Sequence, residues 1–515
     1  MPEGRRTPSR RRLYSAVVRC LDAKVETWVQ VLALLAAVWF VFCFLWVSFS
    51  RIGYPYDLEW MEGGMVTHSL RLLRGRSLFG PPSVEFIPYI YQPFYSVVVA
   101  LIGHWVGLSI PLARGVSVVS TWVVAGLLFR TVQRETGSVR AAVAGVGLLF
   151  ALYSVTGYWY DLARVDTLFM ALVFGALYVG KYHAGRWQSV LLVVVLMVAA
   201  YFTKQTALLF VPLAFPLLAS HKRSHGLAFL LGTVLIVTVL TLVIDQATDG
   251  WYTYYVRDVV ASEPVNWARI QGGFWSKAAG DVPFLLAGLV LMAVWDLSGR
   301  SVREVAGACW YLATAAGLVS GVLSYSWQGG FDNNFLPFYL FGIIPASGAL
   351  AWAWNRGGAR WSFVASWALL AQFFMLAYNP VAQVPTDEEV ADGERLISLL
   401  AGSAGPVLIP EHPWYAVLAG KEPSYHSMAL EDLRHKQKGM WPEDLRERLR
   451  EGYYDLVVIS WDPKRRSLGN YPPELRRYYE RDQVLRFKGR AMGSYVGTWA
   501  RPSLVYRPRQ GRGGG

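Results

Sequence analysis

Long apolar runs alternate with short polar connections over most of the chain, from residue 28 to residue 378. A helix needs roughly 20 consecutive apolar residues to cross a bilayer. Runs of this kind centre near residues 38, 122, 147, 173, 194, 212, 235, 290, 313, 345 and 368, so we expect about eleven transmembrane helices. The apolar segment 93–110 is treated separately, because a full span there would invert every later loop. We expect it to form an interfacial or partly inserted helix.

Beyond residue 380 the pattern changes to dense charge, prolines and short apolar runs. The runs at 406–409 and 456–460 are typical of β-strands, and a charged helical pattern lies between them. We therefore predict an all-α polytopic membrane bundle with a small C-terminal α/β domain. The expected boundaries are a basic arm at 1–27, a transmembrane domain at 28–380 with a large first outer loop at 50–114, an α/β domain at 381–509 and a disordered tail at 510–515.

Composition agrees with a membrane protein. Of the 515 residues, 54% are hydrophobic and only 17% are charged, whereas soluble chains carry about 25% charged residues. The first apolar run, 28–49, is too long for the core of a cleaved signal peptide, so we expect a retained signal anchor. The three cysteines show no spacing typical of a metal site or a disulfide framework.

The net charge of +13 comes from basic residues that gather in alternate connections. Besides the N-terminal arm, these clusters are Arg130, Arg134 and Arg140; Lys181 and Arg186; Lys222 and Arg223; Arg300 and Arg303; and Arg356 and Arg360. Short cytoplasmic loops retain Lys and Arg, so the arm and these connections are placed in the cytoplasm. An odd number of spans in a plasma (inner) membrane then puts the α/β domain outside the cytoplasm. The basic charge indicates topology, and we predict no nucleic-acid partner.

The first outer loop carries three acids, Asp57, Glu59 and Glu62, at the mouth of the first span. A carboxyl group near an apolar surface has a raised proton affinity, which suits a general base. The same oxygens could instead hold a divalent cation, or remain solvated surface charges. Further along this loop, Glu85 lies within an aromatic band that is typical of a headgroup interface or of a surface that stacks on sugars.

Further polar candidates lie on the same predicted face. Asp161, Arg164 and Asp166 precede an apolar run, where ionisable groups are functional candidates, although Arg164 and Asp166 could simply pair with each other. Cations at the outer mouth can hold phosphate oxygens. Lys204 is one candidate, although its side chain could instead only snorkel to the membrane surface. Arg257 is a weaker candidate for the same role. Asp332, Asn333 and Asn334 follow paired glycines, either as a helix cap or as contacts to a donor headgroup.

The sequence contains no Walker loop, zinc-binding spacing, dinucleotide glycine motif or nucleophile elbow. A scaffold role would explain the spans but not the acids and cations that converge on one face. A secondary transporter would favour inverted repeats and mid-membrane polar residues, and neither is evident. A lipid-linked glycan polymerase or ligase also uses large outer loops and remains an alternative.

The order of these features resembles the GT-C glycosyltransferase superfamily. The nearest branches are the protein O-mannosyltransferase-like and aminoarabinose-transferase-like bacterial membrane proteins. The matching stretches lie within residues 28–380: the acidic motif at 57–64, the Tyr-Pro-aromatic segment at 91–95, the R-x-D at 164–166, the Lys204 segment at 204–206 and the GG-x-x-x-N at 329–334.

This resemblance implies transfer of a sugar from a polyprenyl-phosphate donor to an envelope glycan, lipid or protein, with membrane lipids as further partners. It implies that Asp57 is the base or a member of a metal site, and that Lys204 and Arg164 hold the lipid phosphate. A cofactor is not fixed by the sequence; Mg²⁺ or Mn²⁺ at Asp57 and Asp166 is one alternative. Relatives often have adjacent Asp-Glu, whereas the acids here are separated, which leaves the catalytic carboxylate open among Asp57, Glu59 and Glu62. For the α/β domain, a structural cap is the favoured role and acceptor recognition the alternative.

Overall fold

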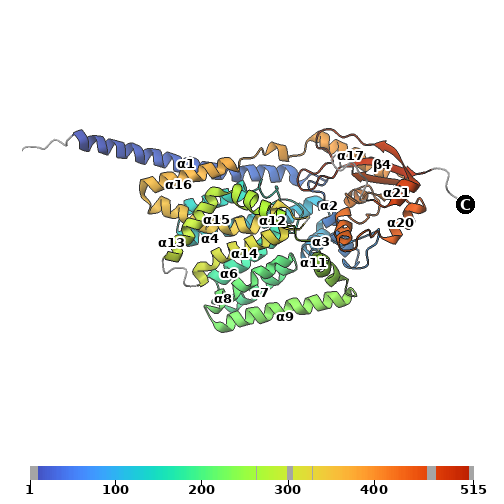
Figure 1. Ribbon diagram of the computed structural model, residues 1–515, viewed down its shortest axis with the longest axis horizontal. Coiled ribbons are helices and arrows are strands. Elements are labelled where there is room, and N and C mark those ends of the chain that lie inside the picture. Colours follow the sequence, from blue (N-terminus) through green and yellow to red (C-terminus); the bar gives the residue numbers. More distant parts are fainter. Residues whose placement is uncertain (1–9, 263, 299–304, 328, 461–470, 510–515) are drawn as a thin grey trace, which may run out of the picture.

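The computed structural model describes residues 10–262, 264–298, 305–327, 329–460 and 471–509. The predicted disordered tail at 510–515 and the first nine residues of the predicted basic arm lie outside the described residues. Within the described part, helices form one elongated bundle and a small sheet lies at one end of it (Figure 1).

Each apolar run that was predicted to span the membrane forms a helix. These helices are α1 (Arg10–Ile52), α4 (Ile110–Thr136), α5 (Val139–Ala151), α6 (Asp166–Tyr182), α7 (Trp187–Tyr201), α8 (Val211–Ala219), α9 (Arg223–Ala247), α13 (Pro283–Ser298), α14 (Val305–Tyr325), α15 (Leu336–Asn355) and α16 (Gly358–Met375). The helical fold of the body, with several apolar helices of membrane length, is therefore confirmed.

Five stretches of helix in the described residues are long and apolar enough to cross a bilayer: Val25–Ile52, Ile110–Thr136, Arg223–Ala247, Gly307–Tyr325 and Asp332–Asn355. The helix α9 lies at the outer edge of the bundle (Figure 1), and many of its leucine and valine side chains are exposed. An exposed apolar surface of this size belongs in lipid, so the chain is an integral membrane protein. The predicted number of about eleven crossings stays a prediction, because several of the other helices are shorter.

The first loop after α1 is itself helical in part. It contains α2 (Glu62–Leu73) and α3 (Phe94–Val106). At 1.5 Å per residue, the 13 residues of α3 extend about 20 Å, less than the roughly 30 Å of a hydrocarbon core. The helix buries Tyr95 and Val99 while Leu101 and Trp105 stay exposed. An interfacial or partly inserted position for α3 stays a prediction.

Short helical segments make up most of the remaining connections. They are η1 (Gln205–Leu209), α10 (Trp251–Thr253), η2 (Tyr254–Val259), α11 (Val260–Ser262), α12 (Trp267–Gly273), η3 (Phe274–Gly280), η5 (Asp332–Phe335) and η6 (Val381–Gln383). Two of them, η2 and η3, are π-helices, a form that is often found at functional sites.

The C-terminal region is a mixed sheet covered by helices, as predicted. Its strands are β1 (Val407–Leu408), β2 (Leu456–Ser460), β3 (Tyr479–Val484) and β4 (Pro502–Pro508), in the order β1-β2-β4-β3 with only β1 and β2 parallel. Its helices are α17 (Asp387–Ala401), α18 (Pro413–Leu418), α19 (Ser427–Lys436), α20 (Glu443–Arg450) and α21 (Pro473–Tyr478). A capping box between Thr386 and Glu389 begins α17.

The C-terminal domain and the first loop share one hydrophobic core. Met65 and Tyr89 from the loop pack in the same cluster as Tyr425, Leu430 and Ile459 from the domain. This core lies at the end of the bundle opposite the start of α1 (Figure 1). The first loop and the C-terminal domain therefore stabilise each other's position. The predicted site residues of the loop lie next to this shared core.

Within the bundle, α1 and α5 approach closely at Gly147. A Cβ atom built on Gly147 would lie 2.9 Å from the carbonyl oxygen of Ala37 and would overlap the side chain of that alanine. Gly126, on α4, has no atom within 4 Å of the same position. Only glycine at 147 allows these helices to pack at this separation.

We predict that Gly147→Ala destabilises the protein by about 1–3 kcal/mol, because overpacking forces α1 away from α5. The matched control Gly126→Ala should be neutral or slightly stabilising, since alanine favours helix over glycine by about 1 kcal/mol. Thermal unfolding in detergent measures both. Equal melting temperatures for the two variants would contradict the close approach.

Candidate active site

A buried ion pair joins Glu62, within the first loop, to Arg114 at its end. Glu62 is the first residue of α2 and Arg114 is in the first turns of α4. The guanidinium donates from Nε to Oε1 at 2.9 Å and from Nη2 to Oε2 at 2.6 Å, and neither side chain is exposed. Burial alone would raise the pKa of Glu62, but Arg114 and backbone donors hold it below its usual value. Glu62 is therefore a charged structural anchor.

The same pair fixes the backbone on both sides of the loop. Arg114 donates to the carbonyl oxygens of Tyr54 and Tyr56, each at 2.6 Å. Glu62 accepts from the N–H of Leu58 at 2.7 Å and from the N–H of Ala163 at 2.8 Å. The backbone at residues 54–58 and the backbone at Ala163, about a hundred residues later, are thereby held together. Glu59 and Arg164 directly follow these fixed positions.

A second buried pair stands beside the first. Arg51, at the end of α1, donates from Nη2 and Nε to the carboxylate of Asp161 at 2.6 and 2.7 Å. The hydroxyl of Tyr153 donates to the same carboxylate at 2.6 Å. Asp161, which was predicted to bind substrate, therefore holds α1 against the loop at 159–165.

Above these pairs lies a cavity of about 180 Å³, which we name the central cavity. Its wall combines residues from eight separate stretches of the chain. Its polar and charged lining residues are Glu59, Tyr91, Trp159, Arg164, Asp166, Lys204, Gln205, Thr206, Ser324, Trp327, Asn333, Asn334, Asp432 and Thr498. The acidic, R-x-D, lysine and Gly-Gly segments that the sequence analysis singled out thus meet at one place.

Arg164 and Glu59 form one ion pair in this wall. Arg164 donates from Nη1 to Glu59 Oε2 at 2.9 Å and from Nη2 to the Tyr91 hydroxyl at 2.7 Å. Its third donor, Nε, is buried and has no hydrogen-bond partner among the described residues. The alternative that Arg164 pairs with Asp166 is wrong, because each of them has a different partner.

Lys204 and Asp166 form the other ion pair. The ammonium donates to Asp166 Oδ1 at 2.8 Å and to the side-chain oxygen of Asn334 at 3.2 Å. Trp159 donates to the second oxygen of Asp166 at 2.9 Å. The lysine precedes η1 and is mostly buried, so it does not snorkel to the membrane surface.

Glu59 has the protonation behaviour of a base. Burial raises the pKa of Glu59 to about 7, against the opposing effect of Arg164 and with a smaller contribution from the charge on Glu62. A carboxyl group with this pKa exchanges protons near neutral pH. The alternative of solvated surface charges is wrong for Asp57, Glu59 and Glu62, because all three are buried.

Asp57 lies behind the cavity wall, against the C-terminal domain. Its Oδ2 is 2.7 Å from His412 Nδ1, and its Oδ1 accepts from the N–H of Gly63 at 2.7 Å. Burial lowers the pKa of His412 to about 3, so the imidazole is neutral and the contact is a hydrogen bond. Burial, with the charge on Glu62, raises the pKa of Asp57 above its usual value.

The C-terminal domain also holds the residues on each side of Glu59. The N–H of Tyr495 donates to Leu58 O at 2.8 Å, and His426 Nε2 lies 2.9 Å from Trp60 O. Met428, Asp432, Gly497 and Thr498 of this domain line the central cavity. The domain therefore forms part of the cavity wall, and its role, as a structural cap or in acceptor recognition, stays a prediction.

Besides Asp57, Glu62 and Asp161, three more predicted residues lie outside the central cavity. Arg257 is exposed on η2 and pairs with Asp258 at 2.8 Å. Asp332 begins η5 and pairs with Lys277 at 3.1 Å. Glu85 lines a different cavity, at the junction of the first loop and the C-terminal domain. The neighbouring Asn333 and Asn334 do face the central cavity.

The carboxylates proposed as metal ligands do not fit a metal ion here. Asp57 is satisfied by His412 and Gly63, and Asp166 by Lys204 and Trp159. Over the described part of the chain, no three His, Cys, Asp or Glu residues are grouped to hold a metal ion. We derive no chemical step from a metal ion.

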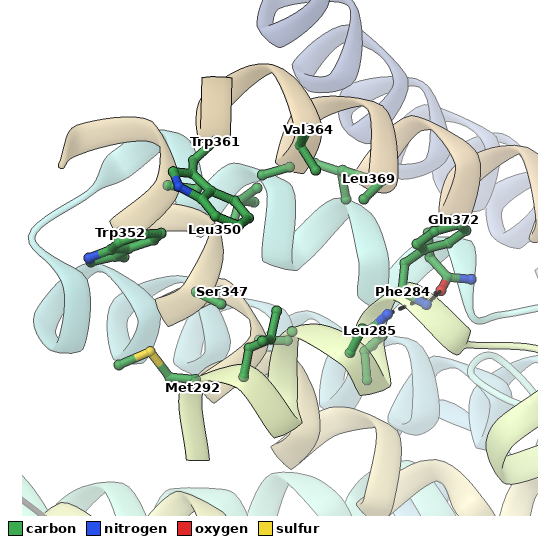
Figure 2. A pocket seen from close by; sticks show the side chains of 18 of the residues that line it. Phe284, Leu285, Met292, Ser347, Leu350, Trp352, Trp361, Val364, Leu369 and Gln372 are labelled. Atoms are coloured by element: carbon green, nitrogen blue, oxygen red, sulfur yellow. Dashed lines mark hydrogen bonds between the residues drawn. The ribbon is translucent and has the colours of Figure 1, made fainter. Parts of the chain in front are cut away.

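A separate apolar cavity of about 310 Å³ lies between α13, α15 and α16. Figure 2 shows its wall of Met292, Leu350, Trp352 and Val364 side chains. Its main polar group, Gln372, accepts hydrogen bonds from the N–H groups of Phe284 and Leu285 at 3.2 and 3.3 Å. The cavity offers no group for acid–base chemistry.

Sequence analysis missed several residues of the site. Arg51 and Arg114 are arginines within or beside apolar runs, and that placement by itself marks a functional or structural candidate. His412 and His426 carried no such signal. Their contacts with the first loop arise only when the C-terminal domain docks on it.

Comparisons with family models and with solved structures both find proteins that are similar to this chain. A family model described as Glycosyltransferase family 87 matches residues 89–324. The chain has an ArnT-like fold. It is similar to the crystal structure of ArnT from Cupriavidus metallidurans bound to undecaprenyl phosphate, with 14% identity, a TM-score of 0.57 and coverage of 93% of this chain and 99% of that chain. The predicted resemblance to GT-C membrane glycosyltransferases is confirmed.

Two other solved structures are similar. ArnT from C. metallidurans in the apo state is 14% identical with a TM-score of 0.57, covering 91% of this chain and 97% of that chain. The Archaeoglobus fulgidus oligosaccharyltransferase in complex with Zn and sulfate is 11% identical with a TM-score of 0.48, covering 92% of this chain and 73% of that one. No curated protein matches the chain.

We predict that Arg114→Leu lowers the free energy of unfolding by about 3–5 kcal/mol, because it leaves the buried Glu62 without its counter-charge. The control Arg257→Gln removes an exposed pair that solvent screens, so it should leave stability nearly unchanged. Thermal unfolding in detergent compares them. An Arg114→Leu variant as stable as the control would contradict the anchoring role of the pair.

Proposed function

We propose that this protein is a membrane glycosyltransferase that transfers one sugar from a polyprenyl-phosphate donor to an acceptor hydroxyl outside the cytoplasm. The observation that carries the proposal is the central cavity. There a carboxyl group with a pKa of about 7 lies within hydrogen-bond distance of Arg164, close to a lysine that faces the same space. The family 87 match and the ArnT-like fold support the reaction type, and ArnT itself has been crystallised with undecaprenyl phosphate.

Glu59 is the proposed base. The acceptor oxygen forms a bond to the anomeric carbon of the sugar while the bond from that carbon to the phosphate oxygen breaks. The acceptor proton moves to a carboxylate oxygen of Glu59, and the polyprenyl phosphate leaves with the bonding electrons. Glu59 faces the cavity, whereas Asp57 lies behind it and is engaged by His412.

Arg164 and Lys204 are proposed to stabilise the departing phosphate. Arg164 lines the cavity, and its buried Nε has no hydrogen-bond partner among the described residues, so a small movement of the guanidinium would let it donate to a phosphate oxygen. When Glu59 takes up the proton, its charge is neutralised and the Arg164 guanidinium loses its counter-ion. The phosphate gains negative charge in the same step, so the two charge changes compensate each other in a site sheltered from water.

Asn334 and the C-terminal domain complete the proposed site. Asn334 holds the Lys204 ammonium, and Asn333 adds a further amide to the wall. Asp166 keeps Lys204 directed into the cavity. Thr498 and Asp432 bring two polar groups of the domain into the cavity wall, which supports a part for the domain in acceptor recognition.

The orientation rests on charge. Among the described residues, the basic connections at 130–140, 181–186, 222–223 and 356–360 join helix ends far from the C-terminal domain, which sits at the end opposite the start of α1 (Figure 1). Short cytoplasmic loops retain Lys and Arg. This supports a position of the central cavity and the α/β domain on the extracytoplasmic face of a plasma (inner) membrane.

We predict that Glu59→Gln lowers kcat by about 100-fold or more, because general-base catalysis contributes 10²–10⁴-fold. Only the unprotonated carboxylate can accept a proton. The wild-type kcat should therefore rise with pH and level off above the Glu59 pKa of about 7.

The measurement is sugar transfer from a panel of polyprenyl-phosphate sugars by the purified protein. Asp258→Asn, which removes an exposed carboxylate outside the cavity, should keep the wild-type rate and pH profile. A Glu59→Gln variant with near wild-type kcat would rule out Glu59 as the base. Movement of substrate across vesicles without glycan product would favour transport over the proposed reaction.

Lys204→Gln is expected to weaken donor binding by about tenfold, because a charge-assisted hydrogen bond to the lipid phosphate is lost. Arg257→Gln is the matched control, since it also removes one outer cation but one that points away from the cavity. Donor KM, or direct binding of polyprenyl phosphate, measures the effect. An equal loss in both variants would show that general surface charge attracts the donor, not Lys204.

A further inference from the structure

A second polar cavity lies where the first loop meets the C-terminal domain. This junction cavity has a volume of about 420 Å³ and is larger than the central cavity. Its wall contains both regions: α2 and residues 84–86 on one side, and residues 404–407, 420–424 and 448–454 on the other. Nothing in the proposed transfer step uses it.

The lining of the junction cavity carries an excess of positive charge. Five of its side chains are cations and two are carboxylates: Arg71, Arg74, Arg76, Lys421 and Arg448 against Glu85 and Glu422. Glu85 is shared, since it lies 3.8 Å from Arg76 and 3.2 Å from Arg448. Glu422 pairs with Arg74 at 2.6 Å.

Two cations remain without a carboxylate partner in the described part of the chain. Arg71 donates from Nε to the carbonyl oxygen of Ser77, and its guanidinium lies over the Phe86 ring at 4.5 Å. Lys421 donates to the carbonyl oxygen of Ser403 at 2.6 Å. These carbonyl groups position the side chains but supply no full counter-charge. Burial and the nearby Arg76 lower the pKa of Arg71 against the opposing effect of Glu85.

An aromatic face borders the same cations. Tyr453 is 46% exposed, and the Arg448 guanidinium lies 5.0 Å from its ring centre. Binding sites commonly combine apolar or aromatic surface with a few fixed charges. A ligand that carries both a ring face and an anionic group fits this combination better than a bare anion.

The junction cavity is connected to the proposed base through α2. Glu62 begins this helix three residues after Glu59, and Arg71 lies nine residues further along. At 1.5 Å per residue the helix covers about 13 Å between them. A ligand held at Arg71 therefore lies a short distance from the central cavity, on the side formed by the C-terminal domain.

We propose that the junction cavity binds an anionic glycan, a sugar chain bearing phosphate or carboxylate groups, as the acceptor of the transfer reaction. The role of this glycan as the acceptor rests on the proposed function. Its binding to the junction cavity does not depend on that function. Arg71 and Lys421 contact the anionic groups, and Tyr453 packs against a sugar ring.

The test is calorimetric titration of the purified full-length protein with three probes: a phosphorylated maltooligosaccharide, the same oligosaccharide without phosphate, and inorganic phosphate. The phosphorylated glycan should bind about tenfold or more tightly than either of the others, since one charge-assisted contact is worth at least that factor. Its affinity should fall as salt is raised. Inorganic phosphate that binds as tightly as the phosphorylated glycan would overturn the assignment to a glycan.

The variant Arg71→Gln/Lys421→Gln should lose at least about tenfold in affinity for the phosphorylated glycan, and Lys421→Gln alone should lose part of it. Arg486→Gln, which removes an exposed arginine of the same domain outside the cavity, is the matched control. Melting temperature and elution volume establish that each variant is folded. Undiminished binding by folded Lys421→Gln and by the double variant would overturn the proposal.

The two proposals fail in different ways. A Glu59→Gln variant should bind the phosphorylated glycan with wild-type affinity although transfer is lost. If the wild-type protein binds the glycan but transfers no sugar to it, the binding site stands and its role as acceptor site is overturned. In an active enzyme, Arg71→Gln should raise the acceptor KM several-fold and leave the donor KM unchanged.

Discussion

The buried ion pair between Glu62 and Arg114 is the constraint on which the rest of the site depends. Two opposite charges with no solvent exposure are tolerated only when every donor and acceptor is used. Here the surplus hydrogen bonds go to backbone groups at residues 54, 56, 58 and 163. Those positions flank Glu59 and Arg164, so satisfying the pair also fixes the spacing of the proposed base and the proposed phosphate ligand.

The charged groups of the site are arranged as pairs because a low-dielectric wall penalises an isolated charge. Glu59 with Arg164 and Asp166 with Lys204 keep the wall close to neutral without substrate. A change in the protonation of Glu59 then changes the charge balance at Arg164 directly. This coupling allows one carboxyl group to influence both ends of a transfer reaction, the acceptor hydroxyl and the leaving phosphate.

The C-terminal domain completes this arrangement. It contacts residues 57, 58 and 60 through His412, Tyr495 and His426, and its core is continuous with that of the first loop. The same docking creates the junction cavity, since cations from the loop and from the domain meet only there. Positioning of the proposed base and recognition of an acceptor thus depend on one interface.

The sequence by itself determined the apolar helices, the β1 and β2 runs and most of the central cavity's charged residues. Hydrophobic periodicity and the cost of charge beside apolar runs are local properties that a sequence displays directly. Only the tertiary structure decided which partner each charge has. It separated Glu59, which faces the cavity, from Glu62 and Asp57 beside it, and it moved Arg257 and Glu85 out of the central cavity. Those outcomes depend on burial and on contacts between residues more than 350 positions apart, such as Asp57 with His412, and no local pattern encodes them.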